Sequence, residues 1–309
     1  MKNVVEELKR ILEEREGDRY EVSITEVVKR NDVIRKSLCV RMKGGSIGAN
    51  LYEDDLERKR EALNGDLEKL ADYVTEVIRK NLDDSEFPDK VKKDLEGLRD
   101  YSVAKDLVLC HLVSKKGNEE YLRNLVSIPF LDLAICFYFI VGSDREQGKL
   151  SVTKELFNGW NVSTSELLER ARANTQARLP HCIVSMYDFL VSVMGTDPFG
   201  KFMNEPEPPE ECGCMYVLTN AEKMLGSAVI LYPGLMKSVS EKIGFEEIAI
   251  LPSSVHECIL ILKAAAPDAD YLRGMVRETN ESSVPPDEIL SNSVYLYSAK
   301  TDEISIWED

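Results

Sequence analysis

The stretch EEIAILPSSVHECILIL, residues 246–262, places a polar corner between two hydrophobic segments. The flanking segments are short runs rich in Ile and Leu, which are typical of buried strands. Pro252 and the two serines that follow it favour a tight turn. Two buried strands would hold the side chains of this corner at a fixed position, which a functional site requires.

The corner carries four candidate site residues, Ser253, Ser254, His256 and Glu257. One interpretation is a hydrolase in which His256 activates a serine and Glu257 orients the imidazole. Against it, Ser254 and His256 are only two residues apart, Glu257 would point to the opposite face of a strand from His256, and the chain has no G-x-S-x-G elbow. We favour the structural interpretation, in which the serines form a tight turn and His256 makes local hydrogen bonds.

Strands and helices are mixed around this corner rather than strictly alternating, which favours an α+β fold with mixed, mainly antiparallel sheets. The region 213–309 predicts one compact α+β unit. Its expected strands are MYVLTN (215–220), AVILY (228–232), 246–251, 257–262, 293–298 and 303–307, and its expected helices are 234–243 and 268–278.

The rest of the chain predicts one or two further α/β subdomains. Region 1–100 predicts a helix, a β-meander and charged helices. Region 101–195 predicts an α/β unit in which IPFLDLAICFYFIVG (128–142) is one central strand, Ser163 and Glu166 start a helix as a capping box, and 183–194 is an apolar helix. Region 196–212 is rich in Pro and Glu and predicts a linker or long surface loop.

The composition limits the function classes. The 309 residues include 43% apolar residues, enough for a sizeable core, and 39 Lys and Arg against 55 Asp and Glu give a net charge of −16. This charge works against direct nucleic-acid binding and against anionic membrane surfaces, and no apolar run reaches the roughly 20 residues of a bilayer-spanning helix. The first 17 residues predict an amphipathic helix rather than a secretory signal, so we expect a cytoplasmic protein.

Other polar clusters have simple structural interpretations. The seven cysteines lie mostly in apolar runs, which fits a reducing compartment. A zinc site could use Cys212, Cys214, His181 and Cys182, but the C-x-C spacing is poor and loop cysteines are the preferred interpretation, so no metal is expected.

Glycines and acidic pairs in the first region are also interpreted structurally. Gly44, Gly45 and Gly48 lie between two strand segments without a following Lys-Ser/Thr, which favours a hairpin turn over a phosphate loop. The pairs Asp54–Asp55 and Asp83–Asp84 predict helix-end and surface charges. No cofactor site is predicted.

Several segments together resemble a bacterial family of unknown function, number 5688. They are SITEVVKRNDVIRKSLCVR (23–41), IPFLDLAICFYFI (128–140), WNVSTSELLERARANT (160–175), MYVLTN with GSAVILYPGLM (215–236), LPSSVHECIL (251–260) and VPPDEILSNSVYLYSAKTDEI (284–304). The similarity covers nearly the whole chain. It implies one continuous architecture and a bacterial or mobile-element origin, and it implies no activity, cofactor or catalytic residue.

The absence of a complete catalytic, nucleotide or metal signature leads to a non-catalytic protein-binding module as the expected function. An acidic face would then meet a basic protein partner. Two alternatives stay open: a hydrolase that uses the Ser253/Ser254, His256 and Glu257 cluster, and an acidic inhibitor that mimics nucleic acid.

Overall fold

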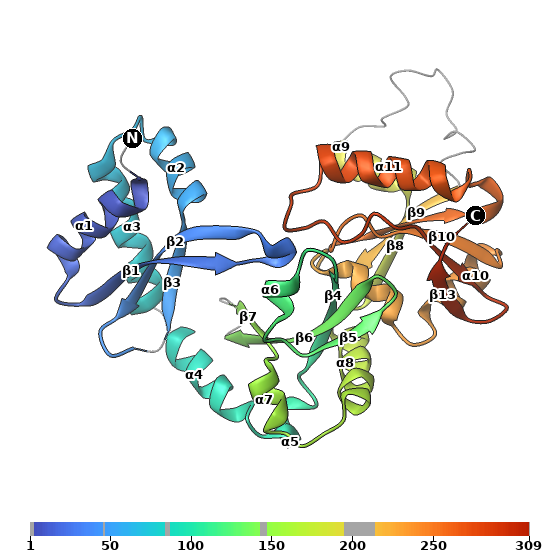
Figure 1. The fold of residues 1–309 in the computed structure, drawn as a ribbon, viewed down its shortest axis with the longest axis horizontal. Helices are drawn as coiled ribbons and strands as arrows, with labels where there is room; N and C mark the ends of the chain where they lie inside the picture. Colours follow the sequence, from blue (N-terminus) through green and yellow to red (C-terminus); the bar gives the residue numbers. More distant parts are fainter. Residues whose placement is uncertain (1–2, 46, 84–86, 143–146, 195–213, 309) are drawn as a thin grey trace. The chain divides into compact units, whose positions relative to one another are not determined.

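The computed structural model of the chain describes residues 3–45, 47–83, 87–142, 147–194 and 214–308. Two compact units divide it, Met1–Asp100 with Ile140–Leu150 and Tyr101–Phe139 with Ser151–Asp309. Three sheets, mainly antiparallel, carry packed helices, which confirms the predicted α+β class (Figure 1). The predicted linker at 196–212 lies outside the described residues. Within the described ranges, no helix is long and apolar enough to cross a membrane.

The first unit packs helices on one face of a three-stranded sheet. Its elements are α1 (Val4–Glu16), β1 (Tyr20–Val28), η1 (Arg30–Asp32), β2 (Ile34–Met42), β3 (Gly48–Tyr52), α2 (Glu53–Ala62), α3 (Leu67–Ile78), η2 (Arg79–Asp83) and α4 (Phe87–Gly97). The order β1-β2-β3 with antiparallel pairs confirms the predicted amino-terminal helix and β-meander. Alternate strand residues such as Val22, Leu38 and Val40 join the buried stripe of α1 in one core.

The next segment, residues 101–178, contains a four-stranded sheet; most of the segment belongs to the second unit, whereas residues 140–150 belong to the first. Its elements are α5 (Tyr101–Ala104), β4 (Leu109–Ser114), α6 (Glu119–Leu122), β5 (Ser127–Phe130), β6 (Leu133–Gly142), β7 (Gln147–Ser151), α7 (Lys154–Asn158) and α8 (Thr164–Arg178). The single central strand predicted at 128–142 is wrong, because β5 and β6 are two antiparallel strands. The chain reverses at Leu131, which has φ 52°, and at the polar Asp132. The predicted start of α8 is confirmed, since the Ser163 hydroxyl accepts a hydrogen bond from the Glu166 N–H at 3.1 Å.

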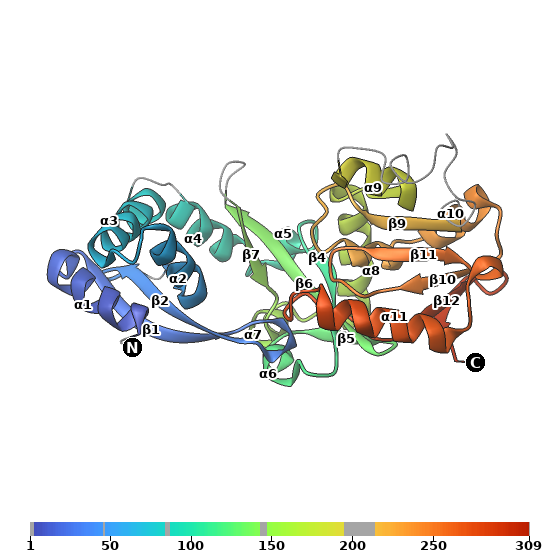
Figure 2. The same ribbon diagram turned by 90° about the horizontal axis from the view of Figure 1, so that it is seen from above.

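A six-stranded sheet completes the second unit. Its elements are β8 (His181–Ser185), α9 (Met186–Met194), β9 (Met215–Asn220), η4 (Gly226–Leu231), α10 (Leu235–Ile243), β10 (Glu247–Leu251), β11 (Cys258–Leu262), η5 (Lys263–Ala265), α11 (Ala269–Ser282), β12 (Tyr295–Ser298) and β13 (Glu303–Ile306). The strand order is β13-β12-β10-β11-β9-β8, and Figure 2 shows the four central strands side by side. α9 and α11 cover the same face of this sheet (Figure 1).

Two sequence predictions in this region are wrong. The segment AVILY is not a strand, because residues 226–231 form the fully buried 3₁₀ helix η4. The apolar helix predicted over 183–194 begins only at Met186, because its first residues belong to β8, which pairs with β9. Ser185 ends this strand and caps the helix, since its hydroxyl accepts a hydrogen bond from the Asp188 N–H at 3.0 Å. Apolar runs of this kind satisfy either period until tertiary pairing decides.

Asp132 ties the turn between β5 and β6 to the segment that leads into β12. Its carboxylate accepts hydrogen bonds from the hydroxyls of Ser291 at 2.6 Å and Ser293 at 3.0 Å, and from the Tyr295 hydroxyl. Burial, followed by the neighbouring Asp132 charge, raises the pKa of Tyr295, so the phenol stays a donor. One carboxylate thereby organises three hydroxyl groups that are more than 150 positions away in the sequence.

We predict that Asp132→Asn lowers the free energy of unfolding by about 3 kcal/mol, since each hydrogen bond to a charged group contributes about 1.5–3 kcal/mol. Chemical denaturation of the purified chain measures this difference. The control is Asp106→Asn, at an exposed residue, which we expect to change stability by less than about 0.5 kcal/mol. Equal midpoints for the two variants would contradict the role given to Asp132.

Candidate functional site

The polar corner, residues 252–257, joins β10 to β11 as the sequence predicts, and it is held by main-chain hydrogen bonds. The Val255 N–H donates to the Glu288 carbonyl at 2.9 Å, and the Leu290 N–H donates to the Ser253 carbonyl at 3.0 Å. Two strands therefore bracket the corner, and a third segment of chain fixes it from the side. Its side chains have defined positions.

His256 lies in this corner with both ring nitrogens facing partners other than a serine. Nδ1 accepts a hydrogen bond from the Leu225 N–H at 3.3 Å, and Nε2 lies 3.4 Å from Oε1 of Glu288. Because Nδ1 is the acceptor, the neutral imidazole carries its proton on Nε2, towards the Glu288 carboxylate. The ring thus links the corner to two other segments.

Neither Ser253 nor Ser254 forms a hydrogen bond with the imidazole of His256 in the described chain. Ser254 is buried, and its hydroxyl accepts a hydrogen bond from the main-chain N–H of His256 at 3.0 Å. The Ser253 hydroxyl makes no hydrogen bond with a described residue. A catalytic serine needs a ring nitrogen at its hydroxyl, so this geometry favours a structural role for His256, and the hydrolase alternative stays a prediction.

A close approach of the chain at Gly226 supports the same corner. A Cβ atom at Gly226 would collide with Oγ1 of Thr219 and with the carbonyl oxygen of His256. Those two atoms form a hydrogen bond of 2.7 Å, and the Ser227 hydroxyl donates to the Val255 carbonyl at 2.9 Å. Only glycine fits here, and it lets η4 pack directly on the corner.

Glu257 points into a separate pocket on the other face of the sheet. The pocket has a volume of about 240 Å³ and lies between α9 and the paired strands β8 and β9. In the register of these strands, Cys182 is opposite Thr219 and Val184 is opposite Val217, so four side chains line one face. The residues lining the pocket are Cys182, Val184, Asp188, Phe189, Ser192, Val217, Thr219, Lys223 and Glu257.

Charged groups of both signs stand at this mainly apolar pocket. Asp188 is already engaged, because its carboxylate accepts a hydrogen bond from the Ser185 hydroxyl at 2.6 Å. The side chains of Lys223 and Glu257 form no hydrogen bond or ion pair with any residue in the described ranges. An apolar pocket with a few polar groups is the usual form of a ligand site, so this pocket is a candidate binding site in the second unit.

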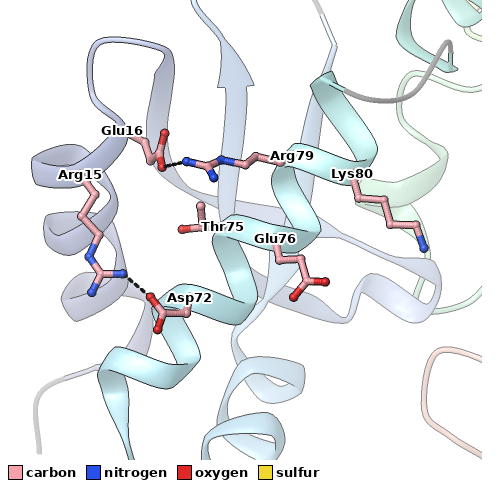
Figure 3. Close-up of a pocket in the computed structure, with 7 residues that line it drawn as sticks. All are labelled: Arg15, Glu16, Asp72, Thr75, Glu76, Arg79 and Lys80. Atoms are coloured by element: carbon pink, nitrogen blue, oxygen red, sulfur yellow. Dashed lines mark hydrogen bonds and ion pairs between the residues drawn. The ribbon is translucent and has the colours of Figure 1, made fainter.

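A second, charged groove lies in the first unit between α1 and α3 (Figure 3). Its volume is about 620 Å³, and its lining residues are Arg15, Glu16, Asp72, Thr75, Glu76, Arg79 and Lys80. Ion pairs already neutralise part of it: Arg15 binds Asp72 at 2.8 Å and Arg79 binds Glu16 at 2.5 Å. These pairs connect the end of α1 to α3 and to the start of η2, which makes the groove a charge-balanced contact between helices.

The cysteines and histidines do not form a recognisable metal centre among the described residues, where no group of three or more potential ligands occurs. Cys212 lies outside these residues. Burial raises the pKa of Cys110 to about 11 and that of Cys136 to about 12, so both are neutral thiols at pH 7. They act as small buried hydrophobic groups, as the sequence predicts.

The acidic pairs differ in environment. Asp54 lies exposed in the first turn of α2, and its hydrogen bond to Arg35 is the main cause of its lowered pKa. Asp83 corrects the prediction of a surface charge, because its side chain is only 5% exposed. It accepts a hydrogen bond from the Tyr20 hydroxyl and pairs with Arg19 at 2.9 Å, which explains its burial. Asp84 lies outside the described residues.

Sequence reasoning singled out Glu257 and Cys182, each for another role, but missed the other pocket residues. Lys223 follows β9 in an ordinary-looking turn, and Asp188 lies on α9 with no motif around it. The available signal was the alternation of Cys182 and Val184 in a short segment rich in β-branched residues. The helix predicted over the same segment hid this signal.

Gly226→Ala should lower the free energy of unfolding by about 2 kcal/mol or more, because the new methyl group meets main-chain atoms that cannot move away. Gly274→Ala is the matched control, since Gly274 lies within α11 and nothing is within 4 Å of its Cβ position. That change should raise stability by about 0.5–1 kcal/mol through helix propensity. Thermal and denaturant unfolding of both variants measure these two opposite changes in stability. A Gly226→Ala protein as stable as wild type would refute the close packing.

A third pair of variants concerns threonines with opposite hydrogen-bonding states. Oγ1 of Thr75 is buried without a partner in the described chain, so Thr75→Val should leave stability unchanged or raise it by about 1 kcal/mol. Oγ1 of Thr175 accepts from the Cys110 N–H at 3.0 Å and donates to the Ala171 carbonyl, so Thr175→Val should cost about 1–2 kcal/mol. Denaturant unfolding compares them, and a reversed order would be incompatible with these contacts.

The comparisons with known proteins agree with the resemblance found in the sequence. The model of a family described as "Family of unknown function (DUF5688)" matches residues 1–299. No curated protein and no solved structure matches the chain. The matched range contains the first unit and the second unit up to residue 299, with the corner at 252–257 and the pocket under α9, and β13 lies beyond it. This match over almost the full length establishes that the chain belongs to DUF5688, a family of unknown function.

Proposed function

We propose that this chain is a non-catalytic protein-binding module whose second unit binds an extended segment of a basic protein. The observation that carries the proposal is the open, acidic edge of the six-stranded sheet at β13. In the described sheet β13 is an end strand that pairs only with β12. An extended peptide can add to such an edge through main-chain hydrogen bonds.

The excess of acidic over basic residues lies mainly in the second unit. This unit contains 28 Asp and Glu against 16 Lys and Arg, whereas the first unit contains 27 against 23. A basic partner is therefore attracted mainly to the second unit. Because this attraction is electrostatic, we expect binding of the basic partner to weaken as the salt concentration rises.

The register of β12 and β13 indicates which main-chain groups are available. Trp307 donates its N–H to the Val294 carbonyl, so Trp307 and Val294 are a hydrogen-bonded pair. Along an antiparallel ladder such pairs alternate with pairs whose main-chain groups point away from each other. By this alternation the N–H and C=O groups of Ile304 and Ile306 point away from β12, towards the open edge. These groups are the ones a partner strand would use.

Side chains along the edge favour a basic partner over a second copy of this chain. Asp302, Glu303 and Glu308 are exposed, and the segment 301–308 has no basic residue. Two such edges would repel each other, which is a common protection of edge strands against self-association. A strand with Lys or Arg at alternate positions would pair with the same edge favourably.

The polar corner supports the non-catalytic part of the proposal. His256 accepts a main-chain hydrogen bond at Nδ1 and faces Glu288 at Nε2, so its two nitrogens serve contacts within the fold. The buried Ser254 hydroxyl is likewise used within the corner. These contacts account for the corner without a reaction.

The test is capture of proteins from a native lysate at low salt with wild-type chain and four variants. Glu303→Lys reverses a charge on the edge, and its control Glu278→Lys reverses an exposed charge on α11. Ile304→Pro removes an outward N–H, and its control Ile304→Val keeps this donor.

We expect a basic protein to be retained in near-stoichiometric amount by wild type and both controls, and about tenfold less by Glu303→Lys and Ile304→Pro, a loss of about 1.4 kcal/mol. Mass spectrometry identifies and quantifies it. Equal recovery on all five baits, or no retained basic protein, would contradict the proposal. Circular dichroism of each bait excludes unfolding as the cause.

A further inference from the structure

We propose that the pocket under α9 binds a free α-amino acid with an apolar side chain, with Glu257 receiving its ammonium group and Lys223 its carboxylate. This proposal concerns a different surface from β13 and is independent of the protein-binding function. It rests on the combination of an apolar interior with two oppositely charged side chains that have no partner in the described chain.

The interior of the pocket is suited to an aliphatic or aromatic side chain. Val184 and Val217 form one cross-strand pair on its floor, and Phe189 from α9 lines it as well. Val217 is 3% exposed, so the floor is part of the packed sheet rather than a mobile loop. Binding of an apolar side chain here is favoured because it removes apolar surface from water.

The volume limits the size of the ligand. About 240 Å³ is below the range of roughly 300–1,000 Å³ typical of pockets for drug-sized ligands. A nucleotide or a sugar chain would not fit inside, whereas one amino acid would. The size therefore selects a small ligand before any charge is considered.

The charges at the pocket select a dipolar ligand. Lys223 and Glu257 both line the pocket and form no ion pair with each other in the described chain. A purely anionic ligand would be repelled by the carboxylates of Glu257 and Asp188, and a purely cationic ligand would leave Lys223 without a partner. A free amino acid carries both charges on adjacent groups and satisfies both side chains.

Hydroxyl groups complete the polar end of the site. The Thr219 hydroxyl donates to the His256 carbonyl at 2.7 Å, and the Ser192 hydroxyl donates to the Phe189 carbonyl at 2.7 Å. Each donor hydrogen is therefore used, and the oxygen lone pairs can still accept hydrogen bonds. These oxygens would accept hydrogen bonds from an ammonium group bound beside Glu257.

The turn that carries Lys223 is fixed by its own hydrogen bonds. Asn220 closes it, with its side-chain amide donating to the Met224 carbonyl at 2.9 Å and its Oδ1 accepting from the Met224 N–H at 3.3 Å. Lys223 itself has φ 52°, a conformation that L-residues seldom adopt. The cation is thereby presented from a defined backbone position at the pocket.

Isothermal titration calorimetry of the full chain with L-leucine, L-methionine and L-phenylalanine, each titrated separately, tests the proposal. Two leucine analogues probe the charges: 4-methylpentanoate lacks the ammonium group and 3-methylbutylamine lacks the carboxylate. We expect saturable one-to-one binding of at least one amino acid. For leucine, if it binds, each analogue should bind at least about tenfold more weakly, a loss of about 1.4 kcal/mol.

Variants locate the binding. Glu257→Gln and Lys223→Gln should each weaken it at least about tenfold, while Glu281→Gln and Lys237→Gln, at exposed residues elsewhere, should leave it unchanged. Thermal unfolding confirms that all four variants are folded. Absence of saturable binding for all three amino acids, equal binding of a singly charged analogue, or unchanged binding in the two pocket variants would each overturn the proposal.

Discussion

The antiparallel pairing of β10 with β11 at the centre of the six-stranded sheet is the constraint on which the second unit depends. Ile248 pairs with Leu262 and Leu251 with Ile259, so two apolar strands run side by side with the polar corner at one end. Successive residues leave a strand on opposite faces. This period separates His256, which contacts Glu288 and Leu225, from Glu257, which lines the pocket under α9.

Hydrogen bonds from distant segments convert this pairing into a rigid framework. Residues 288–291 run along the corner, and Asp132 accepts hydrogen bonds from the hydroxyls of Ser291, Ser293 and Tyr295. Gly226 lets η4 approach the same corner from another side. Polar groups that are buried in this way stabilise a fold only when each has a partner, and Asp132, Ser254 and Thr219 all have one. The main role of the corner is therefore to join β10 and β11 to residues 288–291 and to η4.

The two proposed binding features use different parts of the same sheet. β13 offers main-chain groups at an open end, and the pocket under α9 offers a small apolar volume with two charges. Both lie in the unit that carries most of the acidic excess. The charged groove of the first unit differs from both, because ion pairs between α1 and α3 already neutralise much of it. Charge alone therefore does not identify a site in this chain; unpaired charge beside apolar surface does.

The sequence by itself determined the α+β class, the amino-terminal helix and meander, the strands around the corner and the start of α8 at Ser163. Each of these follows from local periodicity, turn residues or capping. Tertiary structure decided the rest, because apolar runs such as 183–194 and 228–232 satisfy strand and helix alike until they find partners. The pairing of β9 with β11 brought Lys223, in the turn after β9, and Glu257, just before β11, to one pocket, and long-range pairing of this kind leaves no local trace in the sequence.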